Sequence, residues 1–224
     1  MADLMRFQFI KGEELRFLSH LDLLRTFERA LRRAQIPMAL TEGFHPKPKL
    51  SFASALAVGI TSQAEYADLV LSEEMTPTEF ATRLNTVLPP GLRIVRAGVT
   101  SEKAPALMSV VNTAVYRAEL EGDTIPGETV ERILSAEELL VERSTKKGTR
   151  TVDVRPLLYS LEVNGTEFIF SCAIGSEGNL RPEELVNLLG FQFSDVLLDR
   201  TGLFIRTDEG LCDPFAGIEV SYGN

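Results

Sequence analysis

Basic side chains gather in the first fifty residues of this 224-residue chain, where their types suit an anionic ligand. Residues 1–50 hold nine Lys and Arg against six Asp and Glu, whereas the rest of the chain holds 14 against 26. The whole chain has a formal net charge of −9, which argues against a protein that coats nucleic acid over its entire surface. A local positive field on an acidic body can still attract phosphate groups. The sequence therefore indicates one binding region near its start.

The first candidate group lies on and before a helix expected over residues 19–34. Ser19 can cap this helix, and Pro37 ends it. Apolar residues at spacings of three and four predict the buried stripe, namely Leu21, Leu24, Phe27, Leu31 and Ala34. Forked guanidinium groups suited to phosphate precede the helix or lie on its polar face, and these are Arg16, Arg25, Arg29, Arg32 and Arg33. The competing interpretation is a solvated face on which Asp22 pairs with Arg25 and Glu28 with Arg32.

The second candidate group is the loop that reads EGFHPKPK from residue 42 to residue 49. Pro46 and Pro48 favour an extended backbone at the residues before them, and alternate side chains of an extended chain point the same way. The cations expected to project together are His45, Lys47 and Lys49. A stiff loop displays such groups at small entropic cost, which favours ligand binding. Phe44 beside them can stack on a base or pack in the core.

Acid–base chemistry has few candidates, because His20 and His45 are the only histidines. His20 is expected in the first turn of the helix and His45 on the loop, so the topology does not assure contact between them. If they met, they could serve as metal ligands or as a general acid–base pair. Two histidines without a third ligand give no clear metal site. Walker, Rossmann, HExxH and GxSxG motifs are absent as well, and we therefore expect no catalytic residue, no metal and no cofactor.

The elements that must position these groups follow the order β-α-β-β-α-β. Strands are expected near residues 5–10, 50–53, 65–72 and 92–99, and helices near residues 19–34 and 76–87. Residues 13–17 are expected to continue or pair with the first strand, and residues 38–41 to form a short strand. The second half repeats the order by pattern alone, and its Asn164-Gly165 dipeptide predicts a hairpin between strands near residues 159–163 and 167–173. We expect an α+β protein of two ferredoxin-like units, residues 1–105 and the acidic residues 106–224, with helices packed on antiparallel sheets.

Cysteine usage and hydropathy bear on the compartment. Cys172 and Cys212 cannot by themselves form a disulfide framework or a four-thiolate zinc site. The chain has no run of about 18 apolar residues and no N-terminal pattern typical of a signal peptide. A cytoplasmic protein without membrane contact is therefore expected.

Two long segments resemble the radical SAM-linked domain of unknown function, the DUF2344 family. They read RFLSHLDLLRTFERALRRAQIP at Arg16–Pro37 and GFHPKPKLSFASALAVGI at Gly43–Ile60. Shorter segments that fit the same family lie at Val152–Val163, Arg181–Glu184 and Arg200–Gly202. Members of the family occur alone or fused behind a B12-binding radical SAM protein, and they are often encoded beside a ribonuclease of the RNase G type and ribosomal proteins.

This resemblance implies a B12-binding radical SAM protein as partner and a role in RNA metabolism or translation. The chain has no CxxxCxxC motif, so the iron–sulfur cluster and S-adenosylmethionine would belong to the partner. The leading hypothesis is a non-catalytic accessory module that recognises RNA or a partner. One alternative is a metal-independent RNA-processing enzyme that uses His45 and His20. The other is a scaffold that binds only proteins.

Overall fold

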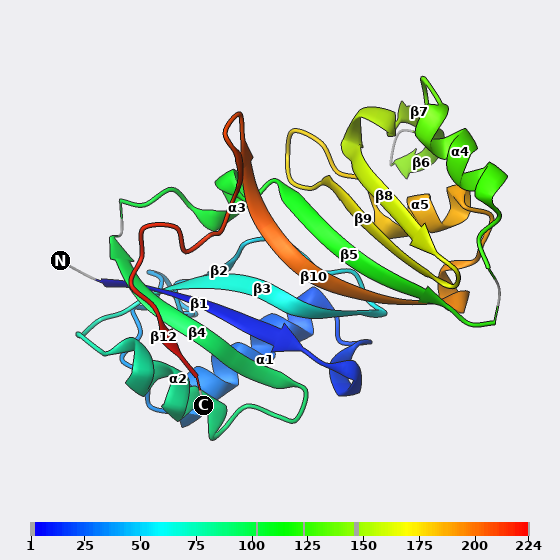
Figure 1. Cartoon of the computed structure of the whole chain (residues 1–224). Coiled ribbons are helices and arrows are strands. Elements are labelled where there is room, and N and C mark those ends of the chain that lie inside the picture. The colour runs from blue at the N-terminus through cyan, green and yellow to red at the C-terminus, as the bar shows by residue number, and fades with distance from the viewer. Residues whose placement is uncertain (1–2, 102, 123, 146–147, 224) are drawn as a thin grey trace. The chain divides into compact units, whose positions relative to one another are not determined.

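The computed structural model describes residues 3–101, 103–122, 124–145 and 148–223, and it shows a mixed α/β protein whose strands pair mostly antiparallel (Figure 1). The elements up to residue 112 are β1 (Asp3–Lys11), α1 (His20–Arg33), β2 (Leu50–Phe52), β3 (Ile60–Val70), α2 (Pro77–Asn85), β4 (Leu92–Ser101) and α3 (Leu107–Val110). The elements that follow are β5 (Thr113–Leu120), α4 (Gly127–Ser135), β6 (Leu140–Thr145), β7 (Gly148–Asp153), β8 (Leu158–Asn164), β9 (Glu167–Ala173), α5 (Pro182–Leu188), β10 (Val196–Thr207), β11 (Gly210–Cys212) and β12 (Ser221–Tyr222). None of the described helices is both long enough and apolar enough to cross a bilayer.

The chain forms two compact units. The first unit comprises residues 1–112 together with residues 200–224, and the second comprises residues 113–199. The predicted domains, residues 1–105 and 106–224, differ from these units chiefly in the C-terminal segment. That segment packs with the first unit because β12 pairs with β4 and because Arg200 is paired with Glu65. Contacts between residues so far apart in sequence leave no trace in local hydrophobic periodicity.

In the first unit the strands follow the order β12-β4-β1-β3-β10, and β2 pairs with β3. β1 is antiparallel to both β3 and β4, and β2 is antiparallel to β3. Alternate residues of β1 face opposite sides, so Phe7 and Phe9 enter the same core. Phe9 lies 4.8 Å from Phe27 of α1, and Phe7 lies 5.2 Å from Phe80 of α2, measured between ring centroids. Both helices therefore pack on one face of this sheet.

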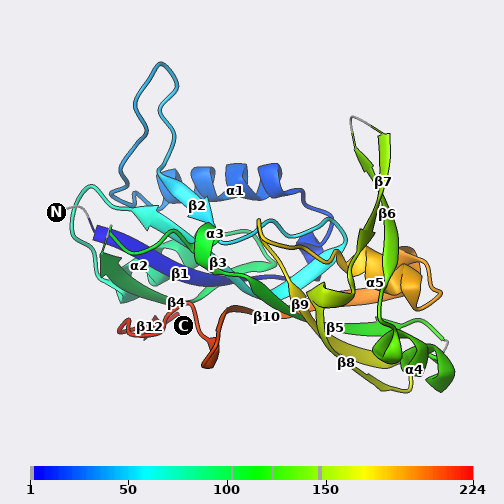
Figure 2. The ribbon, with the colours of Figure 1, turned by 90° about the horizontal axis from the view of Figure 1, so that it is seen from above.

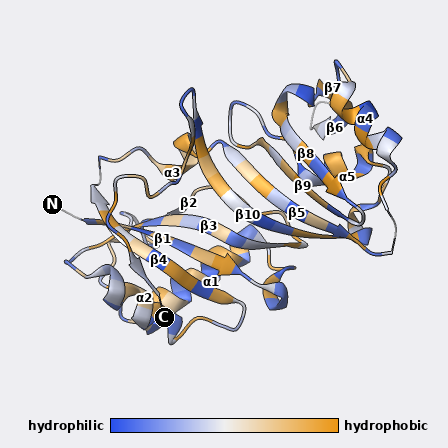
Figure 3. Cartoon of the chain, in the orientation of Figure 1, coloured by the Kyte–Doolittle hydropathy of each residue, from blue (hydrophilic) through white to orange (hydrophobic). Residues whose placement is uncertain are grey.

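The opposite face of β1 is polar and is covered by the C-terminal segment. Arg6 is buried there and donates to Asp68 of β3 at 2.9 Å and to the carbonyl of Pro214 at 2.7 Å. Arg96 of β4 forms an ion pair with Asp213 of the same segment. β4 accordingly alternates between apolar and polar stretches (Figure 3). The face of the sheet opposite the helices thus carries two ion pairs, Arg6 with Asp68 and Arg96 with Asp213.

In the second unit the strands follow the order β10-β5-β9-β8, and β6 pairs with β7 in a hairpin of its own. The hairpin predicted around Asn164-Gly165 is confirmed, because β8 and β9 pair there and Gly165 has a φ of 66°. Glycine adopts such a positive φ without the steric cost that a side chain would add. Along the chain, β6 and β7 come between α4 and β8, so they add two strands to the β-α-β-β-α-β order. The arrangement of two ferredoxin-like units stays a prediction.

Two local predictions for the first unit are wrong. The segment 13–17 does not extend or pair with β1, because Glu13–Leu15 forms a 3-10 turn. The segment 38–41 is not a regular strand, since only isolated pairings occur, at Met38 with Leu71 and at Leu40 with Pro48. Backbone bonds to Gly91 and Lys47 replace the ladders that strands would form. Both segments therefore act as connections that lead into and out of α1.

Candidate anion-binding surface

The start of α1 is fixed by a cap that the sequence predicts correctly. The hydroxyl of Ser19 accepts a hydrogen bond from the backbone N–H of Asp22 at 3.3 Å and donates to its carboxylate at 2.6 Å. These groups satisfy backbone donors that the first turn leaves without intrahelical partners. The hydrogen bond from Ser19, followed by the neighbouring Arg25, lowers the pKa of Asp22. The cap thus fixes the first turn of α1, and the arginines lie on the turns that come after it.

The exposed face of α1 includes Leu21, which is a correction to the predicted buried stripe. The residues of α1 that are buried in the core are Leu23, Phe27, Ala30 and Leu31. With about 100° of rotation per residue, Leu21 lies about 135° around the helix from the middle of this group, and it is 62% exposed. It shares its stripe with Arg25, Arg29 and Arg32. The face that meets solvent is therefore basic with an apolar end.

The arginines of α1 differ in whether another group already occupies them. Arg25 forms an ion pair with Asp22 at 3.0 Å, and Arg33 donates to the carbonyl of Val87. The side chains of Arg29 and Arg32 are exposed and have no ion pair or hydrogen bond within the described residues, so the predicted pairing of Arg32 with Glu28 is wrong. These two guanidinium groups are free to bind an anion.

The loop after α1 is a two-stranded projection, which we call the basic hairpin and define as residues 39–49. Its base is closed by the N–H of Lys49 on the carbonyl of Ala39 at 2.9 Å and by the N–H of Thr41 on the carbonyl of Lys47 at 2.8 Å. Gly43 turns its tip with a φ of 116°. The basic hairpin projects from the sheet on the side that carries α1, near the C-terminal end of that helix (Figure 2). The two candidate groups therefore lie on one side of the first unit.

The side chains of the basic hairpin meet solvent. Phe44 is 100% exposed, so of its two predicted roles the core is wrong. His45, Lys47 and Lys49 are exposed, and within the described chain their side chains form no ion pair or hydrogen bond. Pro48, in contrast, is buried and anchors the base. The rigid part of the hairpin faces the protein, and its cations face outward.

The histidines do not meet at a shared site. The ring of His20 lies 5.4 Å from that of Phe52, with an edge toward the core, and His45 lies at the exposed end of the basic hairpin. Arg16 is also partly occupied, because it binds Glu13 at 2.7 Å. Of the predicted residues, Arg25, Arg29 and Arg32 share the open face of α1, whereas Arg16 and His20 lie at its entry.

Sequence reasoning missed an exposed aromatic residue at that entry. Phe17 is 71% exposed, and the guanidinium carbon of Arg16 lies 4.8 Å from its ring centroid. The strand expected over residues 13–17 concealed this residue. Its place two residues before the capping Ser19 is the signal that could have revealed it, since a chain entering a helix there has left the sheet.

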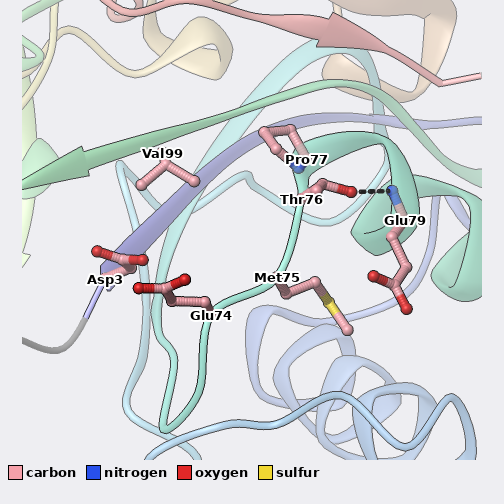
Figure 4. A pocket seen from close by; sticks show the side chains of 7 residues that line it. All are labelled: Asp3, Glu74, Met75, Thr76, Pro77, Glu79 and Val99. Carbon is pink, nitrogen blue, oxygen red and sulfur yellow. Dashed lines mark hydrogen bonds between the residues drawn. The ribbon is translucent and has the colours of Figure 1, made fainter.

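A separate pocket of about 470 Å3 lies at the start of α2 (Figure 4). Its lining consists of Asp3, Glu74, Met75, Thr76, Pro77, Glu79 and Val99. The carboxylates of Asp3 and Glu74 lie close together on one side of it, and Glu79 lies on another. Within the described residues, no group of three or more His, Cys, Asp or Glu is placed to hold a metal ion. The acidic lining repels anions, so this pocket does not extend the basic surface.

A comparison with models of protein families gives a match over most of the chain. The model of a family described as uncharacterized proteins conserved in bacteria, DUF2344, matches residues 5–182. This span includes α1, the basic hairpin and most of the second unit. No curated protein matches the chain.

Proposed function

The chain belongs to the DUF2344 family of uncharacterized bacterial proteins, and from the geometry of this member we propose a non-catalytic recognition module that binds RNA. The surface that binds is the exposed face of α1 together with the basic hairpin. The observation that carries the proposal is the pair of exposed, unoccupied guanidinium groups of Arg29 and Arg32 beside a hairpin whose cations also face solvent. An arginine whose only role was to stabilise the fold would be expected to form an ion pair with a neighbouring carboxylate.

Charge supports this choice of ligand. The segment from residue 16 to residue 49 carries seven Lys and Arg and three Asp and Glu, in a chain with a net charge of −9. Phosphate contacts supply most of the affinity of such surfaces, and the repulsion from the acidic remainder limits binding to this region. The exposed Phe44 favours RNA over an acidic protein surface, because an aromatic ring at a tip between cations can stack on a base.

A salt titration of RNA binding tests the proposal. Replacing Arg25, Arg29 and Arg32 by alanine removes up to three phosphate contacts, so the slope of log K against log salt falls by about 2, given about 0.7 per contact for single strands. The matched control is Arg93/Lys103/Arg150→Ala, which removes three exposed cations outside the surface. We expect the control to keep the wild-type slope.

A second variant addresses the basic hairpin. His45/Lys47/Lys49→Ala is expected to weaken binding at low salt by at least about tenfold, while the fold is unchanged because these side chains are exposed. Equal binding by wild type and both variants, or no RNA binding at low salt, would discard the proposal. Loss of binding in the control alone would move the site to another surface.

The partner and the finer fold are further parts of the proposal. A B12-binding radical SAM protein stays the proposed partner on the resemblance alone, and its test is co-purification that nuclease treatment leaves unchanged. Co-purification without RNA binding would favour the protein-binding scaffold. We also propose that both units are ferredoxin-like, and the strand orders β4-β1-β3-β2 and β10-β5-β9-β8 support this proposal.

An RNA-processing enzyme based on His45 and His20 has less support. The ring of His20 packs against Phe52, and His45 is exposed on the hairpin. General acid–base catalysis needs both groups within hydrogen-bond reach of one reacting site. A His45→Ala variant that keeps any cleavage activity found in the protein would remove the case for this residue.

A further inference from the structure

Exposed aromatic rings lie at both ends of the arginine stripe of α1. Phe17 precedes the helix and is 71% exposed, and Phe44 follows it on the basic hairpin and is 100% exposed. The helix of 14 residues between them is about 21 Å long, given a rise of 1.5 Å per residue. Arg25, Arg29 and Arg32 occupy the intervening face. One exposed ring thus precedes the arginines of α1 along the chain, and one follows them.

Two further exposed apolar residues lie near Phe17, one four residues along the chain and one through a backbone hydrogen bond. Leu21 is 62% exposed and Val58 is 48% exposed. The N–H of Gly59 donates to the carbonyl of Arg16 at 2.9 Å, which brings the loop that carries Val58 beside Phe17. Exposed apolar groups that lie together mark a binding surface more often than isolated ones do. The arginines next to these residues give the surface a charge complementary to an anion that also has apolar faces.

We propose that the RNA bound here is single-stranded, with bases stacked on Phe17 and Phe44 and the backbone between them on the arginines of α1. This inference rests on the proposed RNA-binding function and names its ligand more closely. In a duplex the faces of the bases are covered by their neighbours, so a ring on a protein surface cannot stack on them. A single strand offers both unstacked bases and phosphates, which the surface matches with rings and guanidinium groups.

The test compares a short single-stranded oligonucleotide with a duplex of the same composition, by fluorescence anisotropy at one salt concentration. We expect the wild type to bind the single strand at least about tenfold more tightly. Phe17/Phe44→Ala is expected to lose about tenfold or more in affinity for the single strand and to leave duplex binding unchanged, because it removes both rings on which unpaired bases stack. Phe17→Trp is expected to retain binding, since it preserves the stacking face.

The matched control is Tyr222→Ala, which removes an aromatic side chain that is 72% exposed on β12. We expect wild-type affinity from it, and thermal melting of all variants should coincide. Equal binding of single strand and duplex, or no effect of Phe17/Phe44→Ala, would overturn this inference and leave the RNA-binding proposal standing. Absence of binding to either form would overturn both.

Discussion

Cationic side chains of the first unit occur in two contrasting regions. In the interior, Arg6 binds Asp68 at 2.9 Å and Arg200 binds Glu65 at 2.8 Å, and all four side chains are buried. On the face of α1, the guanidinium groups of Arg29 and Arg32 are exposed and form no ion pair or hydrogen bond within the described residues. A buried charge needs an ion pair or several hydrogen bonds to compensate for its lost hydration, whereas an exposed charge does not. The comparison shows that the fold accounts for the first set and leaves the second set available to a ligand.

Lys11 is an intermediate case, because it is buried without a direct ion pair in the described structure. Its ammonium group donates to the carbonyls of Arg16, Leu18 and Ile60, at 2.9, 3.3 and 3.2 Å. Burial lowers its pKa to about 8, although the nearby Glu65 opposes this shift. Lys11 thereby holds together the backbone around the entry to α1. The buried ammonium group of Lys11 thus binds the backbone on both sides of the exposed Phe17, at Arg16 and Leu18.

The largest effect on stability is expected from breaking the buried pair of Glu65 with Arg200. Glu65→Ala leaves a guanidinium group buried without its carboxylate, so the free energy of unfolding should fall by about 3–5 kcal/mol. Urea denaturation followed by circular dichroism measures this change. The double variant with Arg200→Ala should lose less than the sum of the two single losses. A loss below about 1 kcal/mol for Glu65→Ala would contradict the structural role of this pair.

The second effect is a dependence of the free energy of unfolding on pH, which arises from Lys11. The pKa of Lys11 is lowered from its ordinary value of 10.5 to about 8, so between these values the unfolded chain binds more protons than the folded one. The free energy of unfolding therefore receives a contribution that rises as the pH increases from about 8 to 10.5. Lys11→Met removes this contribution, and the difference between wild type and variant isolates it from other groups. A difference that is flat over this pH range would show that Lys11 titrates normally.

A smaller loss is expected at the cap of α1. Ser19→Ala removes the acceptor for the N–H of Asp22, which should cost about 1 kcal/mol of stability. Thermal unfolding measures it, and Ser51→Ala, at an exposed position on β2, is the control. Equal melting temperatures for the two variants would mean that the hydroxyl of Ser19 contributes nothing to the helix.

The smallest change in stability is expected when the exposed arginines of α1 are replaced, although this replacement should strongly weaken RNA binding. Arg29→Ala with Arg32→Ala should alter the free energy of unfolding by less than about 0.5 kcal/mol, because both side chains are exposed and unpaired. The same variant should weaken RNA binding by about tenfold or more. Denaturation and binding measured on one preparation test this contrast. A loss of stability above about 1 kcal/mol would assign these arginines to the fold.

Local features were predicted from the sequence, and their physical basis is short-range. The cap at Ser19, the turn at Asn164-Gly165 and the exposed basic loop each depend on neighbours within a few residues. The prediction of which residues of α1 are buried was less accurate. A stripe that begins at Leu21 fits the spacing of three and four residues nearly as well as the observed stripe, which begins at Leu23. Only the surrounding core distinguishes the two.

Long-range features were beyond prediction for a physical reason. Arg200 was one cation among many in the sequence, and its partner Glu65 lies 135 residues away. The return of the C-terminal segment to β4 depends on the same kind of contact. The exposure of Phe17 was hidden because its neighbours permit a strand as well as a turn. Tertiary packing decided these points where local preference did not.

The central claim is that the unpaired cations of α1 and the basic hairpin bind single-stranded RNA. Its most direct test is photo-crosslinking of a short oligouridylate that carries 4-thiouridine, followed by mass spectrometry of the crosslinked peptides. The account predicts crosslinks in the segment from residue 16 to residue 49, with Phe17 and Phe44 among the modified residues and none in the second unit. Crosslinks confined to other segments, or their absence at low salt, would contradict it.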